Sequence, residues 1–363
     1  MILGVFTGLT EHGGIQRYGC HVAAVIATVA RARSEQFRFL GLNDPAGQTE
    51  LEVVGVRFSI TGFACNKPVM IRAALAGART IRLAYLNHPN LAPLGMALRT
   101  LKPAARYIVS TYGTEVWHPL PHVRGFGLRH ADMVTAIAKF SADRVAMLQR
   151  IAPEKIAIIP CALDPDFSAP GGDLAPRRHP GEPPILLTVA RLVSPERGEH
   201  KGVDTVIEAL PAVLAAFPGV RYVIVGDGDD RPRLERLAAH LGVSERVTFA
   251  GAVDSALLRT YYEACEIFVM PSRTEGFGIV FLEAMALGKP VIGGNHGGTP
   301  EIWADGTAGF LVEHGNAHAL AARLCLLMGD SALRARMGAA GRALVAANFG
   351  FDRFRQNFGA LLV

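Results

Sequence analysis

The stretch IFVMPSRTEGFGIVFLEAMALGKPVIGG, residues 267–294, contains the pattern that decides the fold. Residues 267–272 form a short apolar run with β-branched and aromatic side chains, which is typical of a buried strand. Residues 279–288 favour helix, and the Gly-Lys-Pro sequence at their end is a strong stop signal. Residues 291–294 are apolar again. The stretch therefore predicts a strand, a loop, a helix and a second strand.

The loop of this unit carries Glu275, and the helix behind it carries Glu283. Gly276, Phe277 and Gly278 lie at the helix entrance, where free N–H groups and the helix dipole favour an anion. A carboxylate beside a phosphate would repel it, so Glu275 is better suited to sugar hydroxyls. The alternative is an ordinary strand–helix turn in which Glu275 is only a helix-start residue.

Apolar strands alternate with helices along the rest of the chain. In the first half we expect strands at 2–6, 37–42, 53–60, 81–87, 107–113, 133–138 and 156–161. In the second half we expect them at 185–191, 221–227, 246–251, 267–272, 291–294 and 309–312. Strands that alternate with helices form parallel sheets covered on both faces. The predicted fold class is α/β, with two Rossmann-like, doubly wound domains facing a central cleft.

The boundary between the domains is predicted at residues 166–184, which are rich in Pro, Gly and charge and are typical of a linker. The first domain then takes residues 1–165 and the second takes residues 185–349. A C-terminal helix at about 350–363 is expected to pack back onto the first domain. Ligands in such folds bind at the carboxyl ends of the strands.

Charge is divided unevenly along the 363 residues, whose net charge is +5. Residues 1–178 contain 20 Lys and Arg against 12 Asp and Glu, which gives +8, and the remainder contains 17 against 20, which gives −3. A basic first half indicates a phospholipid surface, a lipid pyrophosphate or a nucleic acid as partner. No nucleic-acid module is recognisable, so the first two are preferred and no nucleic acid is expected. A merely soluble basic surface is the alternative.

Cysteine spacing and hydropathy indicate the cellular compartment in which the protein is expected. The five cysteines form no C-x-x-C pair, so neither a zinc ribbon nor a disulfide scaffold is indicated, and buried thiols of a cytosolic protein are expected. No run approaches the ~20 apolar residues that span a bilayer. The start, MILGVFTG, lacks the basic region of a signal peptide, so export is not expected.

Other candidate site residues follow strand ends. Arg191 ends the strand 185–191 and Lys201 precedes a helix, so together they could hold the two phosphates of a diphosphate. Gly13 and Gly14 precede the first helix, where amides could meet a phosphate or a sugar, with a plain tight turn as the alternative.

His88 and Tyr112 end neighbouring strands of the first domain, and Glu115 follows closely. Polar groups at those ends could meet the acceptor or the transferred sugar. A structural role is the alternative, because a lone histidine is usually structural.

The sequence GDGDDR, residues 226–231, allows two interpretations. Gly226 and Gly228 after a strand resemble a dinucleotide loop, but Arg231 takes the third glycine position, so an NAD-dependent dehydrogenase is not supported. The aspartates between them could hold Mg²⁺. A glycine turn with acidic helix-start residues is preferred, and no metal site is expected.

Taken in order, these segments resemble glycosyltransferase family four, the glycosyl transferases of group one. The resemblance rests on the ARL and KG residues of 190–202, on VIVGDGDDRPRLE, and on the stretch from VTFAGAVDS through SRTEGFGIVFLEAMALGKP to GTAGFLV. It is dense over roughly 185–350 and thinner in the first half, where GGIQRY, HPNLAP and IIPCALDPDF carry it. The family consists of retaining, nucleotide-sugar-dependent enzymes of the GT-B fold.

The resemblance implies roles for individual residues. Glu275 would lie beside the donor sugar, Glu283 would accept hydrogen bonds from the ribose, and Arg191 with Lys201 would bind the diphosphate, so no metal or other cofactor is needed. Many relatives have His where this chain has Tyr112. A histidine can take a positive charge near neutral pH by becoming an imidazolium, and a tyrosine cannot. His88 and Tyr112 are further catalytic candidates. The predicted donor-binding positions are Gly13, Gly14, Gly226, Gly251, Gly276, Phe277, Gly278, Ile279, Val280 and Glu283.

The sequence thus predicts a retaining glycosyltransferase that moves a hexose from a UDP- or GDP-sugar to a glycan or lipid-linked acceptor in cell-surface synthesis. The alternative is a non-catalytic protein that binds sugar nucleotides. We expect a cytoplasmic protein, peripheral at the inner face of the cell membrane, with the first domain on the acceptor side. The predicted membrane contact lies within 67–106, with Lys67, Arg72, Arg79, Arg82, Arg99, Lys102 and Arg106.

Overall fold

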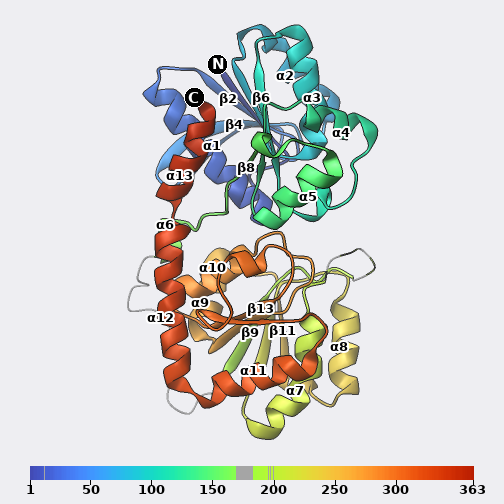
Figure 1. The fold of residues 1–363 in the computed structure, drawn as a ribbon, viewed down its shortest axis with the longest axis vertical. Coiled ribbons are helices and arrows are strands. Elements are labelled where there is room, and N and C mark those ends of the chain that lie inside the picture. Colours follow the sequence, from blue (N-terminus) through green and yellow to red (C-terminus); the bar gives the residue numbers. More distant parts are fainter. Residues whose placement is uncertain (12, 169–182, 195, 197, 199) are drawn as a thin grey trace. The chain divides into compact units, whose positions relative to one another are not determined.

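The computed structural model describes residues 1–11, 13–168, 183–194, 196, 198 and 200–363. The chain forms two compact units, one of Met1–Asp164 with Gly350–Val363 and one of Pro165–Phe349 (Figure 1). Most of the predicted linker, residues 169–182, lies outside the described residues.

The first unit is built on a mainly parallel sheet. Its strands are β1 (Ile2–Phe6), β2 (Phe37–Gly41), β3 (Gly47–Val53), β4 (Val56–Gly62), β5 (Leu83–Leu86), β6 (Arg106–Thr111), β7 (Met133–Ala136) and β8 (Ile156–Ile158). They lie in the order β3-β4-β2-β1-β5-β6-β7-β8, and only β3 and β4 pair antiparallel among those described. The order reverses between β1 and β5, where doubly wound folds bind ligands.

Helices of the first unit are α1 (Gly14–Ala32), α2 (Lys67–Ala76), α3 (Ala92–Leu101), α4 (His122–Arg129), α5 (Lys139–Gln149) and α13 (Phe351–Gly359). Short 3₁₀ turns are η1 (Ala78–Thr80), η2 (Pro89–Leu91), η3 (Thr114–Val116), η4 (Pro153–Lys155) and η8 (Ala360–Leu362). Helix α13 packs against α1 with its aromatic face, where Phe351, Phe354 and Phe358 are buried.

One predicted strand, at residues 53–60, overlaps β4 but begins too early, and β3 was not predicted. Residues 53–60 are not a single strand but the turn and second arm of the β3–β4 hairpin. Val54 and Gly55, with φ of 49° and 72°, form the tight turn, which suits the twist of a hairpin. Strand β3 is half exposed and polar, so no apolar run marked it in the sequence.

The second unit has a parallel sheet in the order β11-β10-β9-β12-β13-β14. Its strands are β9 (Ile185–Val189), β10 (Arg221–Val225), β11 (Val247–Gly251), β12 (Ile267–Met270), β13 (Val291–Gly294) and β14 (Gly309–Val312). Its helices are α6 (Pro165–Ser168), α7 (Val203–Ala216), α8 (Arg231–His240), α9 (Ser255–Ala264), α10 (Ile279–Ala286), α11 (Ala317–Gly329) and α12 (Ser331–Asn348), with 3₁₀ turns η6 (Ser244–Arg246) and η7 (Thr299–Glu301). The predicted α/β class, with two Rossmann-like parallel sheets, is confirmed.

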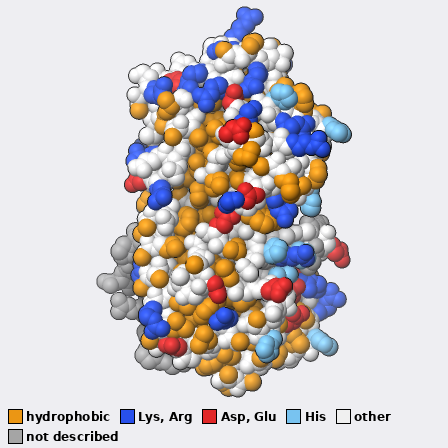
Figure 2. Space-filling view, in the orientation of Figure 1, with side chains coloured by type: hydrophobic (Ala, Val, Ile, Leu, Met, Phe, Trp, Pro, Cys, Tyr) orange, Lys and Arg blue, Asp and Glu red, His pale blue; other side chains and the backbone are white. Residues whose placement is uncertain are grey.

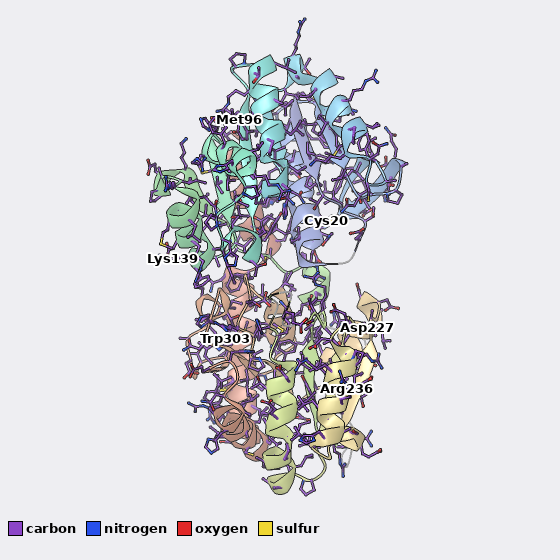
Figure 3. The ribbon with its side chains drawn as sticks, turned by 90° about the vertical axis from the view of Figure 1, so that its right-hand side faces the viewer. Cys20, Met96, Lys139, Asp227, Arg236 and Trp303 are labelled. Atoms are coloured by element: carbon purple, nitrogen blue, oxygen red, sulfur yellow. The ribbon has the colours of Figure 1, made fainter. Side chains whose placement is uncertain are left out.

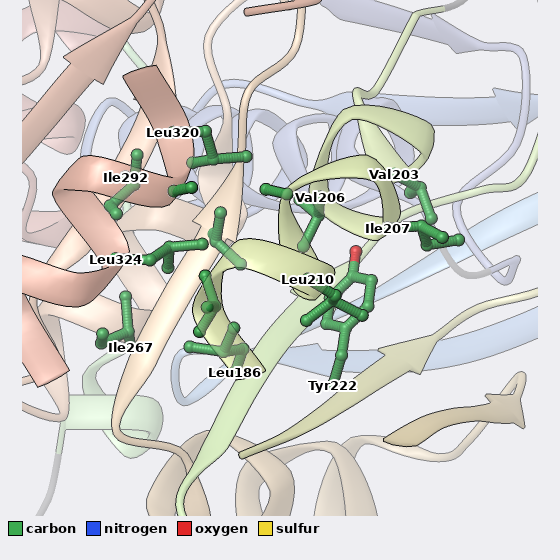
Figure 4. Packing of buried hydrophobic residues seen from close by; sticks show 14 of the residues in the cluster. Leu186, Val203, Val206, Ile207, Leu210, Tyr222, Ile267, Ile292, Leu320 and Leu324 are labelled. Atoms are coloured by element: carbon green, nitrogen blue, oxygen red, sulfur yellow. The ribbon is translucent and has the colours of Figure 1, made fainter. Parts of the chain in front are cut away.

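The core of the second unit lies between its sheet and two neighbouring helices, α7 and α11 (Figure 4). Leu186 and Ile267 from the sheet meet Leu210 of α7 and Leu324 of α11, all of them fully buried. Each such side chain contributes roughly 1.5–3 kcal/mol when it leaves water. The core therefore fixes the central strands β9 and β12, from whose ends the candidate site residues project. Among the helices that the structure describes, none combines the length and apolar character needed to cross a membrane.

We expect the Arg82–Glu35 ion pair to make stability of the first unit pH-dependent. Arg82 binds both carboxylate oxygens of Glu35, at 3.0 and 2.8 Å, and the carbonyl of Leu362 at 3.0 Å. The hydrogen bond from Arg82 holds the pKa of Glu35 below its ordinary value. The pair therefore stabilises the fold above the unfolded pKa, about 4.3, and this contribution is lost as pH falls through the lower folded pKa.

Arg82→Gln should lower the free energy of unfolding by about 1 kcal/mol near neutral pH and by less at about pH 3. Urea unfolding at both pH values measures this. Arg79→Gln is the matched control, because Arg79 is an exposed arginine three residues away. Equal losses for the two variants at neutral pH would contradict the assignment.

Candidate functional site

The centre of the candidate site is an ion pair between Lys201 and Glu275. Lys201 precedes α7 and Glu275 lies in the loop between β12 and α10, and Nζ of Lys201 lies 3.1 Å from Oε2 of Glu275. Only 19% of the lysine side chain and 15% of the glutamate side chain are exposed. The structure thus brings together two predicted site residues that are far apart in sequence.

Hydrogen bonds hold the loop that carries Lys201 against the loop that carries Glu275. The amide of His200 donates to Oγ1 of Thr274 at 2.8 Å, and the amide of Arg273 donates to the carbonyl of His200 at 2.8 Å. Gly202 has a φ of +76°, and a Cβ there would lie 2.4 Å from the carbonyl oxygen of Pro271. Only glycine therefore allows the loop carrying Lys201 to approach the loop carrying Glu275 this closely.

The entrance of α10 lies directly beside Glu275. Gly278 caps the helix with a φ of +98°, and the first helical residues are Ile279 and Val280. The first amides of a helix have no intrahelical partner and carry the positive end of its dipole. Phe277 is buried against Phe349, with ring centroids 5.6 Å apart, which anchors the turn. The arrangement supplies anion-binding amides next to a cation and a carboxylate.

Glu283 lies deeper than a ligand-facing residue would. It is 3% exposed, and its Oε2 accepts a hydrogen bond from the hydroxyl of Tyr262 at 2.7 Å. Tyr262 comes from α9 and is itself fully buried. The predicted contact of Glu283 with a ribose stays a prediction.

Arg191 and Lys201 line one small pocket of the second unit together with Asp204, Asp230 and Arg233. Arg191 is exposed and follows β9, and the amide of its neighbour Leu192 donates to the carbonyl of Asp227. The pocket therefore has three Lys and Arg side chains, Arg191, Lys201 and Arg233, in its lining. Its two inner carboxylates are already bound by Arg233 at 3.1 and 2.6 Å.

Gly226 and Gly251 join the ends of β10 and β11. The amide of Gly226 donates to the carbonyl of Gly251 at 2.8 Å, and a Cβ on Gly226 would lie 1.9 Å from the carbonyl oxygen of Ala190. Close packing against the segment that carries Arg191 requires glycine at Gly226, whereas a Cβ on Gly251 would meet nothing within 4 Å. Direct contact of either with a donor stays a prediction.

The aspartates after β10 have separate partners. Asp227 lies after β10 (Figure 3) and accepts from the amide of Gly228 at 2.8 Å. Asp229 accepts from the amide of Ser194 at 3.0 Å, and Asp230 pairs with Arg233. Within the described ranges no cluster of three or more His, Cys, Asp or Glu is placed to hold a metal. The preference for a glycine turn over a magnesium site stays a prediction.

In the first unit, Gly13 and Gly14 are exposed at the start of α1. A Cβ on Gly14 would meet nothing within 4 Å, so packing does not require glycine there. Ligand contact at this turn stays a prediction.

His88 follows β5 and caps η2, where its Nδ1 accepts a hydrogen bond from the amide of Asn90 at 3.1 Å. Burial, and then the charge of Arg124, lower the pKa of His88 to about 4. His88 is therefore neutral near pH 7, with its proton on Nε2, and can donate a hydrogen bond to a ligand hydroxyl.

We expect activity to show no titration of His88 between about pH 5 and 8, because its pKa of about 4 lies below that range. His88→Gln keeps a neutral donor, so it should retain more activity than His88→Ala and share the wild-type pH profile. Rates measured across that range check this. A break near pH 6.5 in the wild type that His88→Gln removes would contradict it.

Tyr112 is buried within the first unit. It is 5% exposed, and its ring packs edge-on against Tyr18 at 5.3 Å. Among the described residues its buried hydroxyl has no partner in hydrogen-bonding geometry. Glu115 accepts from the amides of Tyr112 and Gly113 at 2.5 and 2.8 Å, so it serves the turn after β6. A role of Tyr112 in sugar binding stays a prediction.

Sequence reasoning missed the residues that support the site. Thr274 fixes the loop before α7 and Tyr262 contacts Glu283, and neither carries a motif of its own. No sequence signal marks either residue, because the partner of each depends on the fold.

Comparison with known proteins gives consistent results. The family model described as glycosyl transferases group 1 matches residues 173–344. A GDP-mannose-dependent α-(1-6)-phosphatidylinositol monomannoside mannosyltransferase of Mycobacterium tuberculosis is 35% identical over 267 residues, which cover 69% of this chain and 68% of that protein. The lipopolysaccharide core biosynthesis glycosyltransferase LpsE of Rhizobium meliloti is 34% identical over 52% of this chain and 53% of its own.

Solved structures share the fold. Anabaena HepE in complex with UDP and glucose has a TM-score of 0.77 at 19% identity and covers 99% of this chain and 98% of its own. Sucrose-phosphate synthase from Thermosynechococcus elongatus has a TM-score of 0.80 at 23% identity with the same coverage. With the mycobacterial relative matched over two thirds of both proteins, and with a GT-B fold, the chain belongs to the group 1 glycosyl transferases.

Proposed function

We propose that the protein transfers a hexose from a nucleotide diphosphate sugar, with retention of configuration, to a glycan or lipid-linked acceptor. The observation that carries the proposal is the Lys201–Glu275 pair at the entrance of α10. A cation, a carboxylate and helix amides in one place match the needs of a diphosphate joined to a sugar.

The chemistry would use these groups as follows. Lys201, Arg191 and the amides of Ile279 and Val280 stabilise the diphosphate as the bond between its oxygen and the anomeric carbon breaks. The acceptor hydroxyl attacks that carbon from the same face, and the departing phosphate oxygen takes its proton. Glu275 stabilises the positive charge that develops on the sugar. No metal is required in this route, because fixed cations and amides neutralise the leaving group.

GDP-mannose is the first donor to test, because several relatives are named as GDP-mannose-dependent mannosyltransferases of phosphatidylinositol mannosides. The acceptor class that these names suggest is a glycolipid with an inositol head group. UDP-hexoses are tested as donors too, because a site built from backbone amides and cations is also compatible with them.

The test titrates the protein with GDP-mannose, UDP-glucose and ADP-glucose, then measures nucleotide release with a lipid extract as acceptor. We expect tight binding of one donor and release of its nucleotide that requires acceptor. Lys201→Met should weaken binding roughly tenfold to a hundredfold, because one charge-assisted contact to the diphosphate is lost.

Binding without release across a broad acceptor panel would instead favour the non-catalytic sugar-nucleotide-binding protein. The burial of Tyr112, where many relatives carry His, is the observation behind that second candidate. Binding of no nucleotide sugar would overturn both.

A further inference from the structure

Helix α4 buries two glycines and one leucine and exposes two large apolar side chains. Gly125, Gly127 and Leu128 face the core, whereas Val123 is 70% exposed and Phe126 is 48% exposed. A helix on a protein surface in water normally has its large apolar residues on the buried side. Although Leu128 follows this rule, the exposure of Val123 and Phe126 favours contact of this face with an apolar surface.

The charge around these side chains is of one sign. Residues 117–131 contain Arg124, Arg129 and three histidines but no Asp or Glu. The acidic residues on either side are already engaged, because Glu115 binds backbone amides and Asp132 pairs with Arg99. No carboxylate in the described part of the chain lies within ion-pair distance of Arg124 or Arg129.

The platform below α4 is rigid. The hydroxyl of Tyr107 donates to the carbonyl of Gly127 at 2.7 Å, and a Cβ on Gly127 would lie 2.7 Å from the backbone of Ala92. The exposed side of α4 is therefore held in place and does not result from a loose segment. The helix also packs against η2, which His88 caps.

Three arginines of the predicted membrane contact at 67–106 are engaged within the first unit. Arg82 is held by Glu35 and Leu362, Arg106 binds the carbonyl of Val363, and Arg99 pairs with Asp132. These arginines are used inside the first unit, so they do not form a free basic face. On α4, by contrast, Arg124 and Arg129 lie beside two exposed large apolar side chains, Val123 and Phe126.

We propose that the α4 face, defined by His122, Val123, Arg124, Phe126 and His130, docks on a lipid membrane with anionic head groups. Figure 2 shows His and Lys or Arg side chains beside hydrophobic ones at the edge of the first unit where Figure 1 places α4. Apolar side chains enter the boundary between head groups and acyl chains, while the arginines bind the lipid phosphates. Leu101 at the end of α3 and Met147 on α5, 54% and 69% exposed, add apolar surface on neighbouring elements.

Docking on this face is independent of the transfer chemistry, so its test needs no donor. The full chain is sedimented with vesicles of phosphatidylcholine alone and of phosphatidylcholine mixed with phosphatidylglycerol, at low and high salt. We expect binding to the mixed vesicles that salt weakens. The double variant Val123→Ser with Phe126→Ser should lower the partition coefficient about tenfold or more.

The matched control is Leu257→Ser with Leu326→Ser, which removes two leucines of the second unit that are 46% and 45% exposed. This control should bind like the wild type, and the α4 variant should keep its transfer rate on a detergent-dispersed acceptor.

Equal partitioning of wild type and α4 variant, or equal binding to both vesicle types, would overturn the proposal. Loss of a dimer in the α4 variant, without vesicle binding by the wild type, would overturn it too and assign the face to a second copy. Vesicle binding through α4 without any sugar transfer would reject only the proposed function.

Discussion

Glu275→Gln should lower the turnover number about a hundredfold or more while the donor dissociation constant changes by less than about threefold. Glutamine keeps the size and hydrogen-bonding atoms of the side chain but loses the charge that stabilises the sugar in the transition state. Ground-state contacts with the donor hydroxyls remain, so binding is spared. Single-turnover kinetics and donor titration separate the two quantities.

The structure also predicts a smaller cost to folding. Glu275→Gln leaves Lys201 without its partner at 3.1 Å in a mostly buried position, which should lower the free energy of unfolding by about 1–2 kcal/mol. Glu313→Gln is the matched control, because Glu313 is an exposed glutamate directly after β14 of the same sheet. Full turnover in Glu275→Gln, or an equal loss in Glu313→Gln, would contradict the assigned role.

Gly226→Ala should lower the free energy of unfolding of the second unit by more than about 3 kcal/mol. The φ of Gly226 is +125°, and an added Cβ would lie 1.9 Å from the carbonyl oxygen of Ala190. Backbone must move to relieve this contact, and Ala190 adjoins Arg191. We therefore expect weaker donor binding as well, measured by titration beside urea unfolding.

Gly242→Ala separates backbone strain from steric contact. Gly242 also has a positive φ, +69°, but a Cβ there would meet nothing within 4 Å. Its substitution should cost only about 1 kcal/mol and leave donor binding intact. Similar losses in the two variants would show that strain alone, and not packing against Ala190, explains the need for Gly226.

The sheets could be predicted from sequence because their strands are short apolar runs. Strand β12, with every residue buried, is an example, and β3 shows the limit. Its polar, half-exposed residues give no apolar signal, and the Val54-Gly55 turn lacks the usual Asn-Gly pair. Helix α4 shows the same limit, since its two glycines are buried together with Leu128 while Val123 and Phe126 are exposed.

The candidate site could be predicted as a set of residue types but not as a geometry. Glu275 and Lys201 were recognisable at a strand end and before a helix, yet they meet only because β9 pairs with β12 in the sheet. The burial of Glu283 and Tyr112 depends on side chains from distant segments, such as Tyr262 and Tyr18. Sequence position alone could not show that these two side chains point into the protein.

The most direct test of the account is the anomeric configuration of the product, determined by NMR after transfer from the donor that binds. We predict a glycoside with the same configuration as the donor, formed in equal amount with the released nucleoside diphosphate and formed much more slowly by Glu275→Gln. A product of inverted configuration, or donor binding with no product from any acceptor, would contradict the account.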